Sequence, residues 1–372
     1  MKSDKTTSKI ILSKSPSSLN LLTKENAIKT LEKLGKFKLK PLPLINGAVC
    51  EFSSDIDLIQ LKKLEEQFTI VENLPLSLKP QFNALIAKKM KPNIQVIPLG
   101  IARIGAADVW DKYKGNGVKV AVIDSGIDLE HPDLQPNIEG GINTFDSFIT
   151  PVDENGHGTH IAGIIAAADN NFGVIGVAPK ARIYSVKVLD RRGEGFLSNI
   201  IKGLEWCVKN RIKVINMSIG IQEPNEALKR ALEAVTKKGI VMVAAAGNDG
   251  RPNTVDYPAA YEETIAVGAV NERGGICWFS STGPEINLVA PGNLVISAAP
   301  GGSFQRLSGT SMAAAHVSGA VALLMEQRPW LSPEEVKVLL EKTAEKLPNL
   351  SKLQQGSGLV RIDRCLKEKG GE

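Results

Sequence analysis

The hydrophobic and polar positions divide the chain into two parts with different patterns. From about residue 93 to residue 365, runs of consecutive apolar residues alternate with stretches that repeat apolar residues at helical spacing. The runs predict strands at 118–123, 182–188, 214–217, 241–245 and 264–270, and the helical stretches cover 159–168, 197–209, 225–238 and 311–327. This alternation indicates an α/β fold, in which a mainly parallel sheet is covered by helices on both faces.

The first part of the chain is more polar and less regular. Helices are expected at 24–34 and 56–67 and strands at 48–52 and 69–71, which together fit a small α+β domain. Residues 1–22, rich in Lys and Ser, predict a flexible tail, and residues 79–93, which lack a clear periodicity, predict a linker. We therefore divide the chain into a tail at 1–22, a small domain with its linker at 23–92, and a large domain at 93–372.

Polar residues follow two of the buried strands predicted in the large domain. Asp124 comes directly after the apolar run 120–123, and Asn248 follows the run 241–246 and Gly247. Open α/β sheets place their functional sites at the carboxyl ends of their strands, so both side chains are candidates for such a site. An Asp that starts a turn and an Asn favoured by a turn are the simpler alternatives.

A candidate nucleophile and a candidate base lie at the starts of two predicted helices. Ser311 stands among small residues before a long apolar run, and His157 lies between Gly156 and Gly158. A serine hydroxyl is a poor nucleophile unless a base takes its proton and hydrogen-bond donors stabilise the oxyanion that it creates. His157 and His160 also have a spacing found in metal sites, but no further Cys or carboxylate has the spacing of a zinc ligand.

Two other classes of α/β enzyme fit the sequence less well. Gly115 and Gly117 precede a predicted strand, whereas a dinucleotide-binding loop follows one. An α/β-hydrolase needs the motif Gly-x-Ser-x-Gly and the order Ser, Asp, His. Here Ala313 stands in place of the last Gly, and the order is Asp, His, Ser.

Four motifs in the order Asp, His, Asn, Ser resemble those of the subtilisin-like serine proteases (subtilases). They lie at 122–128, 155–163, 244–250 and 308–319, and the resemblance covers the whole large domain. It implies a subtilisin-like three-layer fold and a serine endopeptidase that forms an acyl-enzyme. The implied roles are nucleophile, general base, orienting acid and oxyanion donor for Ser311, His157, Asp124 and Asn248, respectively. Ala315 replaces the Pro of most relatives, which predicts a slightly different helix entry, and a non-catalytic pseudo-protease or binding protein is the alternative.

The same resemblance implies how a substrate binds. Substrate-binding strands are expected at Ser218, Ile219 and Gly220 and at Gly193 and Gly195, a pocket wall at Ala245 and Gly247, and the pocket floor at Asp256. A carboxylate at the floor favours Lys or Arg in the substrate residue before the scissile bond. If Asp256 instead faces solvent or binds a cation, this preference is not expected, and the sequence leaves both alternatives open.

The small first domain is similar to the inhibitor-type propeptide of subtilases, which implies a ferredoxin-like α+β fold. In the family this domain assists folding, occupies the active site with its C-terminal tail and is removed by self-processing. The chain is therefore expected to be a zymogen that is cleaved within or near 79–93. An unrelated accessory domain is the alternative.

A structural calcium site is also implied by the resemblance. Residues 169–179 are similar to the calcium loop of many subtilases. The ligands would be the side chains or carbonyl groups of Gln95, Asp133, Ala168, Asn170, Phe172 and Val174. A shell made of oxygen atoms suits Ca²⁺ and not zinc, and a plain polar turn is the alternative.

Composition and charge bear on the partners and the compartment. The chain has 372 residues and a net charge of +5, and residues 1–92 carry 16 Lys, no Arg and nine acids. Without Arg or an aromatic platform, this basic part does not indicate nucleic-acid binding, and no apolar run is long enough to span a membrane. Four cysteines without paired spacing and the lack of a signal-peptide core favour a cytoplasmic protein, although secretion is common among subtilases. A monomer is expected.

Overall fold

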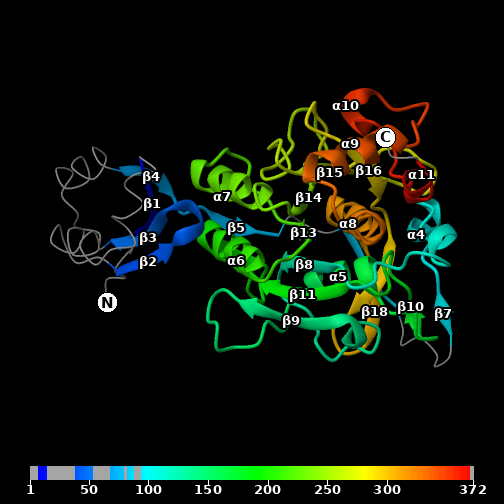
Figure 1. Cartoon of the computed structure of the whole chain (residues 1–372), viewed down its shortest axis with the longest axis horizontal. Helices are drawn as coiled ribbons and strands as arrows, with labels where there is room; N and C mark the ends of the chain where they lie inside the picture. Colours follow the sequence, from blue (N-terminus) through cyan, green and yellow to red (C-terminus); the bar gives the residue numbers. More distant parts are fainter. Residues whose placement is uncertain (1–6, 15–37, 53–67, 79–81, 88–93, 369–372) are drawn as a thin grey trace.

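A seven-stranded parallel sheet forms the centre of the large domain (Figure 1). The structure, a computed structural model of the chain, describes residues 7–14, 38–52, 68–78, 82–87 and 94–368. In their order across the sheet, the strands are β16 (Leu288–Pro291), β15 (Ile265–Val270), β14 (Val241–Ala245), β13 (Val214–Met217), β8 (Lys119–Asp124), β11 (Arg182–Lys187) and β9 (Ile138–Asn143). All neighbouring pairs are parallel, which confirms the predicted α/β fold.

The first of these strands in the chain, β8, lies inside the sheet between β13 and β11. The chain places β9 and β11 on one side of β8 and then β13, β14, β15 and β16 on the other. Open α/β sheets form a crevice where the strand order reverses in this way, at the carboxyl ends of the strands. Because β8 ends at Asp124, the topology brings this residue to the crevice.

Helices cover both faces of the sheet (Figure 1). Helices α5 (His157–Ala166) and α8 (Thr310–Gln327) pack against each other on one face, and α6 (Leu197–Lys209) and α7 (Glu226–Thr236) lie on the other. Helix α8 is buried from Thr310 to Met325, which explains its nearly continuous apolar sequence. The other described helices are α4 (Leu99–Arg103), α9 (Pro333–Thr343), α10 (Lys352–Gln355) and α11 (Ile362–Lys367), with 3-10 turns η2 (Pro43–Ile45), η3 (Ala107–Val109) and η4 (Gln135–Asn137).

The described part of the first domain is a four-stranded antiparallel sheet. Its order is β2 (Lys38–Leu42), β3 (Gly47–Phe52), β1 (Thr7–Ser13) and β4 (Phe68–Glu72), and β3 and β4 match the two strands expected there. The expected flexible tail over 1–22 is wrong for Thr7–Ser13, because β1 pairs with a strand on each side and Ile10, Ile11 and Leu12 are fully buried. The helices expected at 24–34 and 56–67 lie outside the described residues.

Short strands connect the first domain with the large one. Strand β5 (Pro75–Ser77) pairs antiparallel with β12 (Glu194–Phe196). Strand β6 (Phe82–Ala87) pairs antiparallel with β18 (Ser303–Ser308), whose other neighbour is β17 (Val295–Ala299). A further parallel pair joins β7 (Gln95–Val96) and β10 (Gly173–Val174). β6 thus lies within residues 79–93, which were expected to be a linker. The sequence did not predict this strand because its partner, β18, is distant in the chain and leaves no local pattern.

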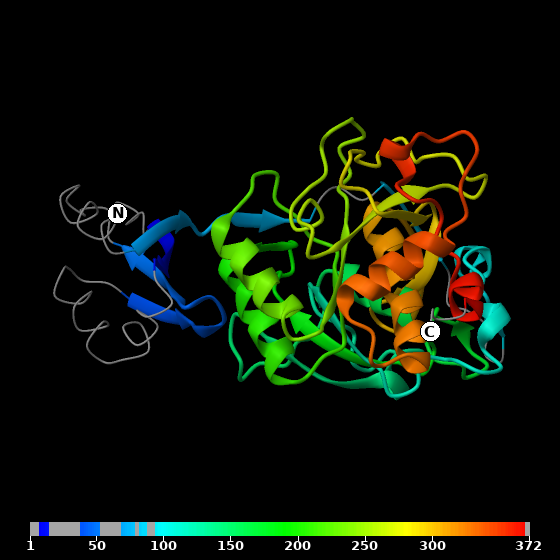
Figure 2. The same cartoon turned by 45° about the horizontal axis from the view of Figure 1, so that its top comes forward.

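Hydrogen bonds also hold the first domain against the large one, where Figure 2 shows its sheet beside α6 and α7. Asn73 Oδ1 accepts from Ser198 N–H in the first turn of α6 at 2.9 Å, which satisfies one of the free donors of that helix end. Arg230 of α7 donates to Ser13 O, also at 2.9 Å. The two domains are therefore joined by side chains as well as by strand pairing.

Two properties of the whole molecule bear on the sequence expectations. The part of the chain that the structure describes contains no helix long and apolar enough to cross a membrane. The four cysteines, Cys50, Cys207, Cys277 and Cys365, are all buried and free. Burial raises the pKa of the Cys50 and Cys277 thiols to about 12, so these two groups are protonated and unreactive at neutral pH.

Candidate active site

Asp124 and His157 form a buried contact at the carboxyl edge of the sheet. His157 Nδ1 lies 2.7 Å from Oδ1 and 2.8 Å from Oδ2 of Asp124, and Ser125 N–H donates to Oδ1 at 2.7 Å. Asp124 is fully buried and His157 is 3% exposed. Because a carboxylate only accepts, Nδ1 carries the proton and a neutral ring presents an unprotonated Nε2. Nε2 has no hydrogen-bond partner among the described residues and can therefore take a proton.

Glycine at position 158 allows α5 to approach β8 closely. A Cβ at Gly158 would lie 2.1 Å from Gly126 O and 3.1 Å from Asp124 Cβ. The first distance is far shorter than van der Waals contact, so any larger residue would push His157 away from Asp124.

Asp153, which sequence reasoning missed, fixes the turn that carries His157. One carboxylate oxygen accepts from Gly156 N–H and Ser125 Oγ, each at 2.9 Å, and the other accepts from Thr159 N–H at 2.9 Å and Thr159 Oγ1 at 2.6 Å. These donors include free N–H groups at the start of α5, where a negative charge is also favoured. An acidic residue just before a predicted helix is the signal that could have found it.

Ser311 is the second residue of α8 and faces the residue that follows β13. Its Oγ donates to Ser218 O at 3.4 Å, and Ser218 Oγ donates to Ser311 O at the same distance. Asn216 connects this pair to α8, because its Nδ2 donates to Ser218 Oγ and its Oδ1 accepts from Ser318 Oγ, both at 2.9 Å. The Ser311 hydroxyl thus points to Ser218 and needs only a rotation about χ1 to turn elsewhere.

Thr310, also missed by sequence reasoning, orients the side chain of Asn248. Asn248 Oδ1 accepts from Thr310 N–H at 3.0 Å and from Thr310 Oγ1 at 2.9 Å. The same hydroxyl accepts from Gly247 N–H at 3.2 Å. With Oδ1 held in this way, Nδ2 is the end of the amide that is left to donate to a ligand. Thr310 lies within the motif at 308–319, but the motif alone does not reveal this role, which depends on how closely the start of α8 approaches Asn248.

A small pocket beside Ser311 brings the predicted substrate-binding residues together. It is lined by Ser218, Ile219, Gly220, Ala245, Gly247, Asn248, Asp256, Thr310 and Ser311, and by Leu78 from the first domain. Only about 20 Å³ of it is free. Asp256 is 3% exposed, so the alternative in which this carboxylate faces solvent does not hold.

The other predicted substrate strand, at Gly193 and Gly195, pairs with the chain itself. Gly195 lies opposite Leu76 in the β5–β12 pair, and Leu78 N–H donates to Gly193 O at 2.9 Å. Gly193 has a φ of 76°, and a Cβ there would lie 2.8 Å from Leu78 Cδ1. Glycine is therefore needed both for the backbone conformation and for the close approach of Leu78.

The six predicted metal ligands also come together. Gln95 Nε2 lies 2.6 Å from Ala168 O, 3.1 Å from both Phe172 O and Val174 O, and 3.4 Å from Asn170 Oδ1. Asp133 completes the group, since its carboxylate accepts from Asn170 Nδ2 at 3.2 Å and from Val174 N–H at 2.9 Å.

This arrangement of donors fits a hard cation better than it fits an amide. Four oxygen atoms surround the Gln95 amide nitrogen, which has only two hydrogens to give. Turning the Gln95 amide over would add a fifth oxygen, and the buried Asp133 supplies a carboxylate, whereas the exposed Asp169 of the same loop pairs with Lys114. Burial raises the pKa of Asp133 to about 6, a cost that a bound cation would offset.

The other histidines near the site do not form a metal centre. Burial lowers the pKa of His160 to about 3 and that of His316 to about 4, so both rings are neutral. His160 Nε2 lies 3.1 Å from Val295 O, and His316 Nδ1 lies 2.8 Å from Met312 O. Within the described ranges, no three His, Cys, Asp or Glu side chains gather in a way that could hold a metal ion.

A buried Asp–His pair at the switch point of a parallel sheet, with a serine at the start of the adjacent buried helix, defines a serine hydrolase. The sequence model described as Subtilase family matches residues 115–358. Subtilisin E of Bacillus subtilis is 46% identical over 273 residues, which cover 72% of this chain and 71% of that protein. The subtilisin of Bacillus pumilus is also 46% identical, over 72% of this chain and 98% of its own length. A thermostable alkaline protease of Halalkalibacterium halodurans is 40% identical over 86% of this chain and 89% of its own length.

The chain therefore belongs to the subtilase family, as its four motifs indicate. It is a serine endopeptidase, and its substrates are proteins or peptides.

Thr310→Val is expected to lower kcat about fivefold and to leave KM nearly unchanged. Valine keeps the shape of the side chain but removes the hydroxyl that holds Asn248, and one hydrogen bond of this kind contributes about 1 kcal/mol. Thr310→Ser, which keeps the hydroxyl, is the matched control and should stay close to the wild type. Steady-state kinetics on one peptide substrate make the comparison, and an unchanged kcat in Thr310→Val would mean that Asn248 is oriented by other contacts.

Proposed function

We propose that Asp124, His157 and Ser311 form a catalytic triad that hydrolyses peptide bonds through an acyl-enzyme. The observation that carries this proposal is the buried Nδ1–carboxylate contact, which leaves His157 Nε2 unprotonated and without a partner. Rotation of the Ser311 hydroxyl away from Ser218 O would bring its proton to Nε2. Because Asp124 is buried away from solvent, water screens its carboxylate little, and the carboxylate can stabilise the imidazolium that then forms on His157.

The reaction then proceeds in two halves. Ser311 Oγ attacks the scissile carbonyl carbon while its proton moves to His157 Nε2, and the oxyanion accepts hydrogen bonds from Asn248 Nδ2 and Ser311 N–H. The carbon–nitrogen bond breaks as Nε2 gives the proton to the leaving amine, which leaves an ester on Ser311. Water, deprotonated by Nε2, hydrolyses this ester and restores the free hydroxyl.

The first domain acts in this proposal as a propeptide that holds the precursor in a substrate-like state. Segment 75–78 pairs with β12, and Leu78 lines the pocket beside Ser311 and Asn248. A chain bound in this way presents the carbonyl group of Leu78 to the nucleophile. The hydrogen bonds between Asn73 and Ser198 and between Arg230 and Ser13 join the two domains and add to the affinity of this segment for the cleft.

The bond between Leu78 and Lys79 is the one that this arrangement favours for self-cleavage. The next bond, Lys79–Pro80, is a poor alternative because the imide nitrogen of Pro carries no hydrogen and its ring is rigid. Leu78 also lies well before residue 92, where the composition suggested the boundary. The proposed catalytic part therefore begins at Lys79 and includes β6.

Gln95, Asp133, Ala168, Asn170, Phe172 and Val174 are proposed to hold a structural calcium ion. Support comes from the convergence of oxygen atoms on one point and from the buried carboxylate of Asp133 beside them. Such an ion would tie β7 to the loop that precedes β10 and would have no part in the chemical steps.

Asp256 is proposed to act as the floor of the pocket that binds the substrate residue before the cut. It is buried, lines the pocket with Ala245 and Gly247, and carries a formal negative charge that a Lys side chain can reach. Its small neighbours Ala245 and Gly247 would admit a longer side chain once Leu78 has left, and Leu78 itself shows that an apolar residue also reaches the pocket.

Self-cleavage gives the most direct prediction. The wild-type chain should lose residues 1–78, while Ser311→Ala should stay intact, as seen by intact mass over time. Leu78→Asp should slow the loss strongly because it places a second carboxylate near Asp256, whereas Ser77→Asp, at an exposed position, should process normally. A new N-terminus near residue 92 would contradict the assigned bond, and processing of Ser311→Ala would contradict the nucleophile.

Removal of calcium should lower the melting temperature of the processed protein. If calcium is present at about 100 times its dissociation constant, it adds about 2.7 kcal/mol, which corresponds to about 5–10 °C in a domain of this size. Gln95→Ala and Asp133→Asn should lose this response to EDTA. Asp169→Asn is the matched control, because Asp169 lies in the same loop but pairs with Lys114. A melting temperature that EDTA leaves unchanged at low calcium would contradict the proposed calcium site.

Substrate preference tests the role of Asp256. With peptides that differ only in the residue before the cut, Asp256→Asn should lower kcat/KM about tenfold for Lys and much less for Leu, since it removes a charge-assisted hydrogen bond. Equal losses for both peptides would mean that Asp256 supports the pocket and does not select its ligand.

A further inference from the structure

The outer edge of β18 leads away from the nucleophile. β18 ends at Ser308, three residues before Ser311, and one of its edges pairs with β17. Its other edge pairs with β6, which runs antiparallel from Phe82, opposite Ser308, to Ala87, opposite Phe304. This edge is therefore paired with a segment that follows the proposed cleavage bond in sequence.

The chain passes the active site in one direction, from β12 to β18. Leu78 lines the pocket beside Ser311, and Phe82 is already paired with β18. Four residues span at most about 14 Å, so little slack is left between the two pairings. β5 thus lies on the side of the residues before the cut, and β6 lies where the polypeptide on the leaving side must run.

We propose that the outer edge of β18 is a further substrate-binding strand, for the polypeptide that follows the cleaved bond. The proposal rests on the endopeptidase function and on cleavage after Leu78. From the register, the edge takes residues four to nine positions beyond the cut, which Phe82–Ala87 occupy in the precursor. An exposed strand edge offers unpaired N–H and C=O groups, and an extended substrate satisfies them with its own backbone.

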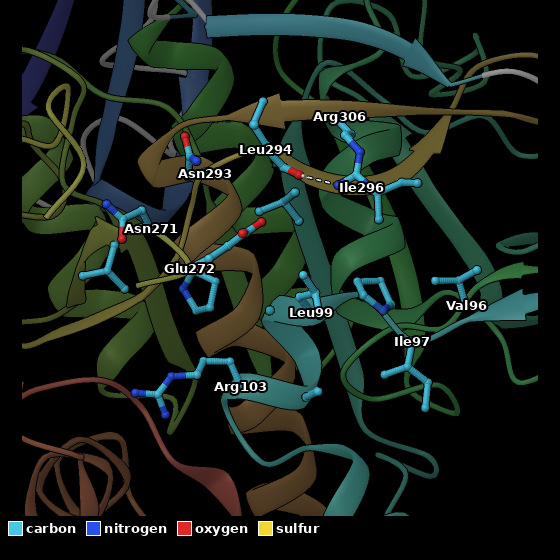
Figure 3. A pocket seen from close by; sticks show the side chains of 16 residues that line it. Val96, Ile97, Leu99, Arg103, Asn271, Glu272, Asn293, Leu294, Ile296 and Arg306 are labelled. Atoms are coloured by element: carbon cyan, nitrogen blue, oxygen red, sulfur yellow. Dashed lines mark hydrogen bonds between the residues drawn. The ribbon is translucent and has the colours of Figure 1, made fainter. Parts of the chain in front are cut away.

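A cavity beside this edge gives the strand a side-chain preference. The cavity has a volume of about 520 Å³ and is lined mainly by apolar residues (Figure 3). Ile296, Arg306 and position 85 lie opposite one another on β17, β18 and β6. Residues that are directly opposite share one face of a sheet, and Ile296 and Arg306 both line the cavity beside Leu99 and Ile97 (Figure 3). A substrate residue seven positions beyond the cut would share this face, and an apolar side chain suits it.

Cleavage after Leu78 leaves β6 attached to the catalytic part. β6 then competes with substrate for the edge of β18 at a high effective concentration, because both belong to one chain. A long substrate can bind more tightly by pairing with the outer edge of β18 only when β6 is displaced from that edge. Weakening the β6–β18 pairing should therefore favour long peptides without helping short ones.

The test compares two fluorogenic peptides with residues 75–78 before the cut, one ending three residues beyond it and one ending nine residues beyond it. The enzymes are the self-processed wild type, Leu85→Pro and Ile86→Pro. Adjacent residues of a strand point their N–H groups to opposite sides, so one of these two variants loses an N–H that faces β18 and the other is its control. The first should raise the ratio of long-peptide to short-peptide kcat/KM about tenfold.

Replacing the Leu seven positions beyond the cut by Asp should remove this gain. A ratio that is the same in all three enzymes and insensitive to that residue overturns the proposal. An enzyme that cleaves neither peptide contradicts the proposed function itself. If both Pro variants fail to fold, the wild-type enzyme is assayed with long peptides that are N-methylated at successive positions. A loss of kcat/KM at alternate positions supports strand pairing, and a uniform response overturns the proposal.

Discussion

The contact between Asp124 and His157 is the interaction on which the rest of the site depends. It combines a carboxylate at the end of a central strand with an imidazole at the start of the helix that packs on that strand. Both groups are buried, so the contact survives only if the sheet, α5 and the turn before it are all in place. Gly158 permits the close approach, and Asp153 holds the turn through five hydrogen bonds.

Strand pairing accounts for how this protein handles polypeptide. Ser311 lies close to two edges of the large domain, that of β12 and that of β18, and the chain's own segments β5 and β6 pair with them. Backbone recognition of this kind is independent of most side chains, which suits an endopeptidase, and Asp256 lines the small pocket between the two edges. In the proposed precursor, the same two edges would hold the segments that are released from the enzyme or kept by it after self-cleavage.

The features predicted from the sequence are those with a local pattern. Consecutive apolar residues predicted the parallel strands, and the capping box that Ser332 and Glu335 form at the start of α9 is an equally local pattern. The four motifs identified the family because each keeps its own residue order. The six proposed ion ligands came from the resemblance alone, and the structure brings them together.

The features that sequence reasoning missed depend on contacts between distant segments. β1 has only three apolar residues in a Lys- and Ser-rich stretch, and the burial that orders it comes from its two neighbouring strands. β6 has no periodicity of its own because its partner is β18. Thr310 and Asp153 look like ordinary polar residues until folding brings the groups that they bind within 3 Å.

Chemical labelling of the active serine tests most directly whether Asp124, His157 and Ser311 act as one unit. The self-processed protein would be treated with a fluorophosphonate, and the adduct would be located by peptide mass. One adduct on Ser311 is predicted, with labelling strongly reduced when the pure processed protein carries His157→Ala or Asp124→Asn after activation in trans by the wild type. Labelling of another serine, or of Ser311 at an undiminished rate in those variants, would contradict the triad.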